Sequence, residues 1–380
     1  MHPYLRHAKQ NQANTIALIR ELVECESPSD NAAAVNRWVD LLASKLEGRA
    51  KVKTFPGGRF GRHFRCEFIL PGRKKEGQIL ALGHSDTVWP LGTLASMPFR
   101  HAKGRLWGPG VLDMKAGVAF FLFAMQALVD LDVPVPRRVV LQLNSDEEVG
   151  SQTSRPLTEE AAKQSLAVLV LEPGAGLDGR LKTARKGVGD YTVTVHGRPS
   201  HAGVDFEAGA SAILELARQI TRIERFTNLK RGLTVNPGVI SGGTRTNVVA
   251  ALAQAEVDIR IARAADAAPL DRKFRALRPV DKRCRIEVTG GLNRPPMERT
   301  AATRRLFGIA RGLASEMGLT LEESSTGGGS DGNFTAALGI PTLDGLGPVG
   351  VGAHAPTESI LVNRIPDRVA LLAALVSQGL

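Results

Sequence analysis

The segment "ILALGHSDTVWP", residues 79–90, decides how the rest of the sequence is interpreted. It begins with apolar residues on both faces, which is typical of a strand buried inside a sheet. It ends in His84, Ser85 and Asp86, polar side chains that strand packing does not require. The segment therefore predicts a strand whose end delivers chemical groups to the edge of a sheet.

Similar short apolar runs occur elsewhere in the first half of the chain, and between them lie stretches with helical spacing of apolar residues. We expect strands at 65–70, 78–83, 137–143 and 166–171, and helices at 15–25, 32–46 and 117–129. This alternation indicates an α/β sheet with helices on both faces. The run at 117–129 is shorter than the ~20 residues that a membrane span needs, so we expect a buried helix.

From about residue 187 the pattern changes to strand, helix, two strands, helix and strand, which is the ferredoxin-like order. The expected segments are 190–197, 207–223, 233–243, 253–262, 268–278 and 284–290. A last helix is expected at 365–378. We therefore expect a domain formed by residues 1–186 and 294–380, with residues 187–293 inserted into it as a second domain.

The composition of the chain limits the partners and the cellular location that we expect. The net charge is +11, but the arginines are scattered and form no long basic tract, so we expect no nucleic-acid partner. Because the longest apolar run is too short for a membrane span, we also expect no membrane partner. Three cysteines lie far apart, which favours free thiols. The first residues include no apolar leader, which favours a cytoplasmic location.

A set of polar residues follows successive predicted strands or glycine-rich turns. Because ligands bind at the carboxyl ends of strands in open α/β sheets, these side chains should converge at one edge. They are His84, Asp86, Asp113, Glu147, Glu148, Glu172 and His354. Each alone has an ordinary explanation, such as a core histidine, a helix N-cap at Asp113 or a solvated acidic loop.

Together, these residues favour a metal site. Gathered carboxylates repel one another unless a cation lies among them. Two histidines with three acidic groups suit Zn²⁺, and a bridging carboxylate lets five ligands hold two ions. In the pair Glu147-Glu148, one glutamate can bind metal while the other acts as general base.

The motifs "GHSDTV", "GPGVLDMKAG", "DEEVGS", "LEP", "SHAG", "TGGGSD" and "GAHAPTE" resemble, in order, those of the M20 family of di-zinc metallopeptidases. The resemblance is closest to the glutamate carboxypeptidase branch and runs from about residue 15 to residue 378. It implies a three-layer αβα zinc-peptidase catalytic domain with an inserted ferredoxin-like α+β lid domain. It also implies a homodimer formed through the inserted domain.

The resemblance implies roles for the gathered residues. His84 and Glu172 would bind one zinc, Glu148 and His354 the other, and Asp113 would bridge them. Glu147 would be the general base, and Asp86 would orient His84 through its other ring nitrogen. The Asp113–Met114 peptide would be cis. Co²⁺ and Mn²⁺ suit overlapping ligand sets.

The inserted domain resembles the family's substrate-contacting lid. His201 would reach the active site of the partner subunit and polarise the scissile carbonyl. Asn247 and Arg294 would contact substrate, and Gly328 and Gly329 would lie near its terminal carboxylate. The alternative for Arg294 is a surface arginine beside a Pro-Pro turn.

The expected activity is metal-dependent hydrolysis of an amide bond. It would release a C-terminal amino acid, with glutamate as one candidate, from a peptide, a folate-like compound or an N-acyl conjugate. Deacylases of the acetylornithine or succinyl-diaminopimelate type share the metal motifs and are the alternative. A non-enzymatic binding protein is a further reading, although it would have no need of Glu147.

A serine hydrolase is another alternative. The stretch "GGSDG", residues 328–332, satisfies G-x-S-x-G, and Ser330, Asp344 and His354 follow the order of the α/β-hydrolase triad. The preceding residues "EESSTGG" make a poor strand, which argues against a nucleophile elbow at Ser330.

Overall fold

The computed structural model describes residues 1–380. The chain divides into two compact units, each with its own hydrophobic core. Unit 1 comprises Met1–Ala184, Arg299–Thr326 and Ser330–Leu380, and unit 2 comprises Arg185–Glu298 and Gly327–Gly329. Unit 2 contains the whole range 187–293, for which the lid and dimerisation role stays a prediction.

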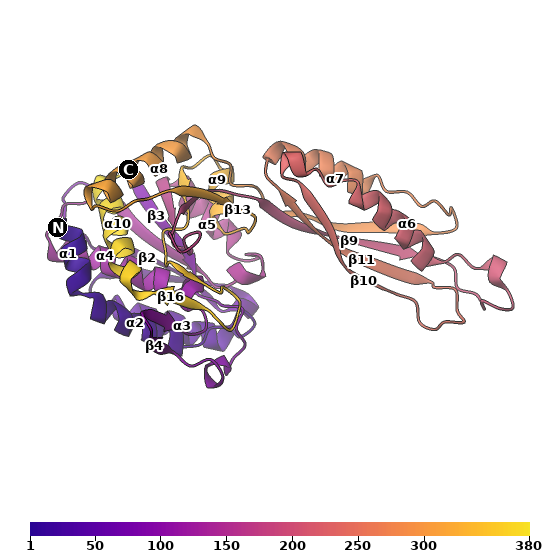
Figure 1. Ribbon diagram of the computed structural model, residues 1–380, viewed down its shortest axis with the longest axis horizontal. Coiled ribbons are helices and arrows are strands. Elements are labelled where there is room, and N and C mark those ends of the chain that lie inside the picture. The colour runs from indigo at the N-terminus through magenta and orange to yellow at the C-terminus, as the bar shows by residue number, and fades with distance from the viewer. The chain divides into compact units, whose positions relative to one another are not determined.

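The centre of unit 1 is a six-stranded sheet (Figure 1). Its order is β1 (Ala50–Pro56), β2 (Arg62–Phe68), β6 (Arg138–Asn144), β3 (Gln78–His84), β7 (Ser165–Val170) and β14 (Thr342–Leu343). The last four strands of this order run parallel. Strand β2 is antiparallel to both of its neighbours, β1 and β6. Every residue of β3 is buried, as its apolar run predicts.

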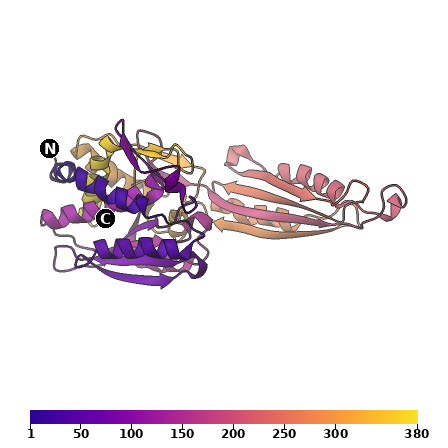
Figure 2. The same ribbon diagram turned by 90° about the horizontal axis from the view of Figure 1, so that it is seen from below.

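Helices cover both faces of this sheet. Successive side chains of β3 point to opposite faces, so Ile79 and Ala81 belong to one core and Leu80 and Leu82 to another. The first core contains α1 (Pro3–Gln10), α2 (Gln12–Glu24), α3 (Ala32–Lys45), α4 (Ala116–Asp130), α8 (Ala301–Glu316) and α10 (Ile365–Gln378). On the other face are α5 (Arg155–Lys163) and α9 (Gly332–Ala337). The three-layer αβα prediction is confirmed (Figures 1 and 2).

Helix α4 is the most apolar helix of the chain. The segment Val111–Asp130 is long and apolar enough to cross a membrane by length and composition, but 78% of its apolar window is buried inside unit 1. It packs against α10 and α2 in the larger core. The expectation of a buried core helix is therefore confirmed.

Two smaller sheets carry loops of unit 1. One contains β15 (Gly350–Val351), β16 (Ser359–Leu361), β5 (Arg105–Trp107) and β4 (Arg100–Ala102), and the other pairs β8 (Leu181–Arg185) with β13 (Glu323–Thr326). Because β16 pairs with β5, the β15–β16 loop lies beside the turn that follows β5. These two segments carry His354 and Asp113.

Unit 2 has the ferredoxin-like order. Its elements are β9 (Gly187–His196), α6 (Ala212–Glu224), β10 (Thr234–Gly242), β11 (Leu252–Ile261), α7 (Ala267–Arg275) and β12 (Arg285–Arg294). The antiparallel sheet has the order β10–β11–β9–β12, and both helices cover one face (Figures 1 and 2). Tyr191 of β9 stacks on Phe274 of α7 with 3.9 Å between ring centroids. Helix α6 begins later than the expected 207, because Ser211 caps it by accepting a hydrogen bond from Leu214 N.

The long segment of unit 2, Arg185–Glu298, begins and ends at one place. Arg185 N donates to Met297 O at 2.9 Å, and Met297 N donates to Arg185 O at 3.0 Å. The first and last segments of unit 2 are therefore held side by side.

Candidate metal centre

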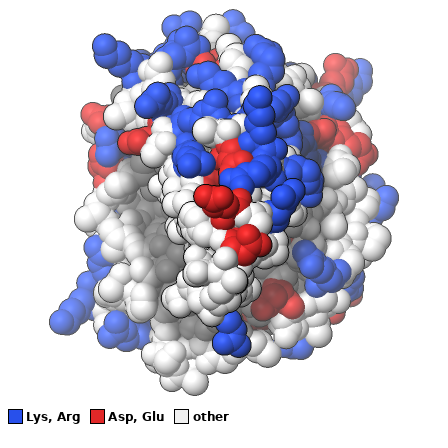
Figure 3. Space-filling view, turned by 90° about the vertical axis from the view of Figure 1, so that its right-hand side faces the viewer, with Lys and Arg blue, Asp and Glu red and all other residues white.

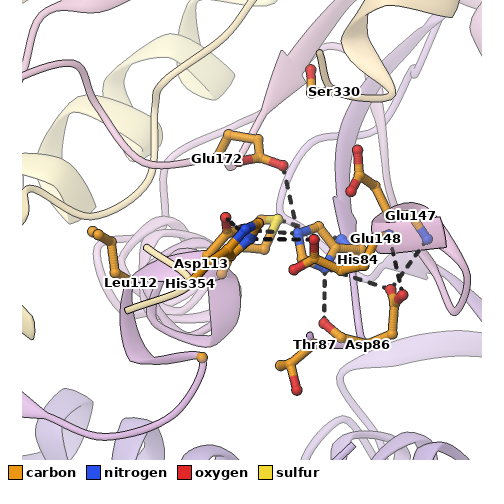
Figure 4. A network of polar contacts seen from close by, with 12 residues as sticks. His84, Asp86, Thr87, Leu112, Asp113, Glu147, Glu148, Glu172, Ser330 and His354 are labelled. Atoms are coloured by element: carbon orange, nitrogen blue, oxygen red, sulfur yellow. Dashed lines mark hydrogen bonds and ion pairs between the residues drawn. The ribbon is translucent and has the colours of Figure 1, made fainter. Parts of the chain in front are cut away.

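The ends of three adjacent parallel strands supply the first part of the site. His84 is the last residue of β3. Strand β6 lies on one side of β3 and is followed by the turn Glu147–Val149, and β7 lies on the other side and is followed by Glu172. Glu148 and Glu172 therefore approach His84 from neighbouring strands on its two sides, as Figure 4 shows.

The turn between β5 and α4 supplies Asp113. The Asp113–Met114 peptide is cis, as the family resemblance implies. The Met114 sulfur accepts a hydrogen bond from His84 N at 3.4 Å, and a Cβ at Gly83 would lie only 2.6 Å from the Met114 methyl. Glycine at position 83 thus lets the turn pack directly against the end of β3.

Two groups of ligand atoms share Asp113 (Figure 4). His84 Nε2 lies 3.0 Å from Asp113 Oδ1 and 3.5 Å from Glu172 Oε1. His354 Nε2 lies 3.3 Å from Asp113 Oδ2 and 3.3 Å from Glu148 Oε2. Each carboxylate oxygen of Asp113 therefore faces a different triad, which is the arrangement of a bridging ligand.

The charges of the cluster favour a cation. Burial would lower the pKa of His84, but hydrogen bonds to Asp113, Asp86 and Glu172 raise it well above its usual value. Hydrogen bonds to Asp113 and Glu148 raise the pKa of His354 to about 10. Burial raises the pKa of Glu148 to about 8. The acidic groups thus hold protons on the cluster, and metal binding must displace them, so metal affinity rises with pH.

The donor set fits two divalent ions. Nitrogen and carboxylate oxygen donors suit Zn²⁺ and related ions, and within each triad the ligand atoms lie within 4.8 Å of one another. Glu148 Oε1 is buried and has no hydrogen-bond partner. A buried carboxylate oxygen without a donor costs free energy unless a cation coordinates it. His84, Asp113 and Glu172 would hold one ion, and Asp113, Glu148 and His354 the other.

Asp86 contacts both His84 and the glutamate turn. His84 Nδ1 is 2.9 Å from the backbone oxygen of Asp86, and 3.5 Å from its carboxylate Oδ1. The carboxylate accepts hydrogen bonds from Ser29 Oγ at 2.7 Å, Glu147 N at 3.3 Å and Glu148 N at 3.2 Å. Asp86 therefore orients the imidazole mainly through its carbonyl and fixes the glutamate turn through its carboxylate. No local sequence signal pointed to Ser29.

Glu147 lies next to Glu148 on the same turn but belongs to neither triad. Ser330 is fully buried, and its hydroxyl donates directly to Asp344 Oδ2 at 2.7 Å. His354 instead contacts Asp113 and Glu148, away from Ser330 in Figure 4. The geometry does not form the Ser330–His354–Asp344 triad, so that alternative is wrong.

The expected substrate-contacting residues of unit 2 form two groups. His201 is exposed and accepts a hydrogen bond at Nδ1 from Gly203 N at 3.1 Å, and Ala202 N donates to Asn247 O at 3.0 Å. Arg294 is only 5% exposed, so it is not a surface arginine.

Arg294 lies with the glycine turn at the other end of the sheet. Its side chain packs beneath Gly329, where a Cβ would be 2.9 Å from Arg294 Cδ. Arg185 Nη1 donates to the carbonyls of Gly328 and Gly329 at 3.2 and 3.0 Å.

The two groups lie at opposite ends of the unit 2 sheet. Arg294 pairs with Val188 at the start of β9, and the antiparallel pairing continues past the end of β9 to His201 and Val248. Ten extended residues of β9 span ~34 Å. His201 and Arg294 of one unit 2 therefore cannot contact the same small molecule.

The family model for peptidase family M20/M25/M40 matches residues 80–378, which include all seven residues of the cluster. The chain belongs to this family. It is 32% identical to carboxypeptidase G2 from Pseudomonas sp. over 376 residues, covering 97% of this chain and 90% of the relative. It is 31% identical to a succinyl-diaminopimelate desuccinylase from Cereibacter sphaeroides over 387 residues, covering 94% and 96%.

The fold agrees with M20 structures. A dinuclear metal-binding peptidase of the M20 family from Bacillus subtilis aligns with a TM-score of 0.67 and 14% identity, covering 98% of this chain and all of the other. The chain is thus an M20 hydrolase with the two-unit fold of its family, rather than a non-enzymatic binding protein.

The shared aspartate leads to a prediction about metal content. His84→Ala and His354→Ala should each lower bound metal by about one equivalent, because each removes a ligand of one triad only. Asp113→Asn should weaken both sites. Elemental analysis after dialysis against trace Zn²⁺ checks this.

The matched control for these variants is His7→Ala. It removes a buried histidine that pairs with Asp130 at 2.7 Å, outside the cluster. It should keep full metal content. Wild-type metal content in Asp113→Asn would contradict the bridging assignment.

Proposed function

We propose that this M20 hydrolase cleaves an amide bond and releases a C-terminal amino acid, with glutamate as the first candidate, in the cytoplasm. The observation that carries the proposal is the pair of triads that share Asp113, with Glu147 beside them on the turn that bears Glu148. Zn²⁺ is the proposed ion, and Co²⁺ or Mn²⁺ suits the same donors. Such ions, when bound, supply Lewis acidity that polarises a carbonyl and makes water a better nucleophile.

Glu147 is the proposed general base. Asp86 Oδ1 accepts the backbone N–H of Glu147, which fixes the turn and the direction in which this glutamate leaves it. Its carboxylate would take a proton from the attacking water and then give that proton to the leaving amine. His201 would donate to the developing oxyanion, and its Nδ1 is already occupied by Gly203 N, so its Nε2 is the atom that would donate.

Charge supports an anionic substrate. Unit 2 contains 19 of the 49 Lys and Arg residues but only 12 of the 38 Asp and Glu residues. Figure 3 shows Lys and Arg gathered in the upper part of the view, on the side where Figure 1 places α6 and α7. The exposed contributors include Arg218, Arg222, Arg225, Arg272, Lys273, Arg275 and Arg278. A positive field of this kind raises the encounter rate of anionic conjugates such as those of glutamate.

A second candidate is an N-acyl amino acid deacylase. It is favoured by the 31% identity to the desuccinylase, which extends over 96% of that relative. Deacylation and carboxypeptidase cleavage break the same type of bond. They differ in whether the enzyme selects the acyl group or the released amino acid.

The substrate proposal predicts a specific ranking. With Zn²⁺ or Co²⁺ present, kcat/KM for an N-acyl glutamate should exceed that for the matching alanine and leucine compounds by about tenfold or more, because a buried arginine such as Arg294 discriminates by paired charge. Steady-state hydrolysis across such a series checks this. A higher kcat/KM for N-succinyl-diaminopimelate, with no preference among the C-terminal residues, would favour the deacylase.

The general-base proposal predicts that Glu147→Gln lowers kcat by about 10²–10⁴-fold, since proton transfer is removed. Its metal content should stay at the wild-type level. Glu148→Gln is the matched variant and should lose metal from the His354 triad. If the two variants behaved in the opposite way, the glutamates would have to be exchanged in this mechanism.

We also propose a homodimer formed through unit 2. Strand β10 lies at an edge of its sheet and exposes Val239 (55%) and Ile240 (60%), and α6 beside it exposes Ile213 (42%) and Leu214 (56%). Unpaired apolar strand edges favour pairing with another chain. His201 and Arg294 of one subunit lie too far apart to contact one small substrate. A second subunit would therefore supply the His201 that acts together with the first subunit's Arg294.

The dimer proposal predicts that Ile240→Lys yields a monomer whose kcat falls by about 10²-fold, the loss expected for one oxyanion donor. Analytical ultracentrifugation and activity measurements check this. Ile69→Lys alters a comparably exposed isoleucine of unit 1 (55%) and should leave both mass and activity unchanged. A fully active Ile240→Lys monomer would contradict the exchange of His201 between subunits.

A further inference from the structure

Glu358 is a fully buried carboxylate that lies outside both ligand triads. Its Oε1 accepts hydrogen bonds from Leu112 N at 2.8 Å and Asp113 N at 3.0 Å. Its Oε2 accepts hydrogen bonds from Gly110 N at 3.0 Å and Trp89 Nε1 at 2.7 Å. Four N–H donors therefore surround one carboxylate, which fills its acceptor sites.

The four N–H groups are the direct hydrogen-bond partners of Glu358, and the buried ammonium group of Lys115 adds a favourable charge interaction without a direct ion pair. Burying a charge without such donors is costly. A glutamine has only one side-chain oxygen, and its NH₂ group would face N–H donors. The position therefore requires two acceptor oxygens, which a carboxylate provides.

The four hydrogen bonds connect segments that are distant in sequence. Trp89 lies in the loop that leaves β3 after His84 and Asp86, and Gly110–Asp113 is the turn that bears the bridging carboxylate. Glu358 itself follows His354 by four residues in the β15–β16 loop. One side chain thus joins the segments that carry His84, Asp113 and His354.

The contact at Asp113 determines where its side chain points. Glu358 accepts hydrogen bonds from the N–H groups of Asp113 and of the preceding Leu112. These bonds fix the backbone on one side of the Asp113 Cα. On the other side lies Met114, whose sulfur accepts a hydrogen bond from His84 N at 3.4 Å. With both sides fixed, Oδ1 faces His84 and Oδ2 faces His354.

We propose that Glu358 is a positioning residue that acts through Asp113 and sets the metal affinity of both triads together. The proposal rests on the proposed metal-dependent function, but it concerns affinity rather than turnover. Outer residues that hold a metal ligand typically change metal affinity or activity by about 10–100-fold. Loss of Glu358 should therefore weaken both sites, whereas loss of a terminal ligand weakens one.

The test is Glu358→Gln, with Zn²⁺ affinity of the apo-protein measured by competition with a chromophoric chelator. We expect both sites to weaken by about 10–100-fold. The KM of the metal-saturated enzyme should stay close to the wild-type value. Wild-type affinity at both sites in the folded variant would overturn the proposal, as would a loss confined to one site.

Glu26→Gln is the matched control. Glu26 also accepts two backbone N–H groups, from Gly92 at 2.8 Å and Leu94 at 3.0 Å, but its carboxylate accepts no hydrogen bond from the Asp113 turn. It should lower the melting temperature without changing Zn²⁺ affinity. An equal loss of affinity in both variants would show that general loop anchoring, and not the position of Asp113, is responsible.

Glu358→Asp covers the case in which the glutamine variant does not fold. It keeps the charge but is one methylene shorter, so it cannot reach all four donors, and the same loss at both sites is expected. If every substrate proved inert, the proposed function would fail while the Zn²⁺ titration still decided the role of Glu358.

Discussion

Carboxylates that lie close together in a small buried volume repel one another, and the arrangement of the site in unit 1 must offset this repulsion. Asp113, Glu148 and Glu172 all lie within ligand distance of a histidine, and the histidines alone cannot neutralise them. Two further buried carboxylates, Asp86 and Glu358, surround the cluster and are satisfied largely by N–H and O–H donors. Unit 1 therefore gathers negative charge around a site where divalent cations would balance it.

Much of the fold could be predicted because the elements that support the site are strongly apolar. Strand β3 and helix α4 are buried almost throughout, so their sequences alone mark them. Strand β1 gave no signal, since its residues are mostly exposed and "AKVKTFP" does not alternate clearly. Helix α1 has only eight residues, too few for a periodic pattern to stand out.

The sequence predicts those site residues that lie at a strand end or in a glycine-rich turn. It does not predict the residues whose role depends on contacts with distant parts of the chain. The ligand set depends on strand order, which places β3 between β6 and β7. The preference of His84 for the carbonyl of Asp86 depends on local backbone geometry. Ser29 is 57 residues from Asp86, and Glu358 is 245 residues from Asp113. No periodicity or spacing connects such distant partners, even though Glu358 ends the motif "GAHAPTE".

The reciprocal hydrogen bonds of Arg185 and Met297 have an evolutionary consequence. A segment whose ends lie side by side can be exchanged without changing the course of the remaining chain. Here that segment carries His201, Asn247 and Arg294, while the cluster residues are encoded before and after it. This segment can therefore change as one continuous stretch of coding sequence while the two ligand triads, which lie outside it, are kept. Relatives of this chain include both a carboxypeptidase and a desuccinylase, and such a separable segment is compatible with that range.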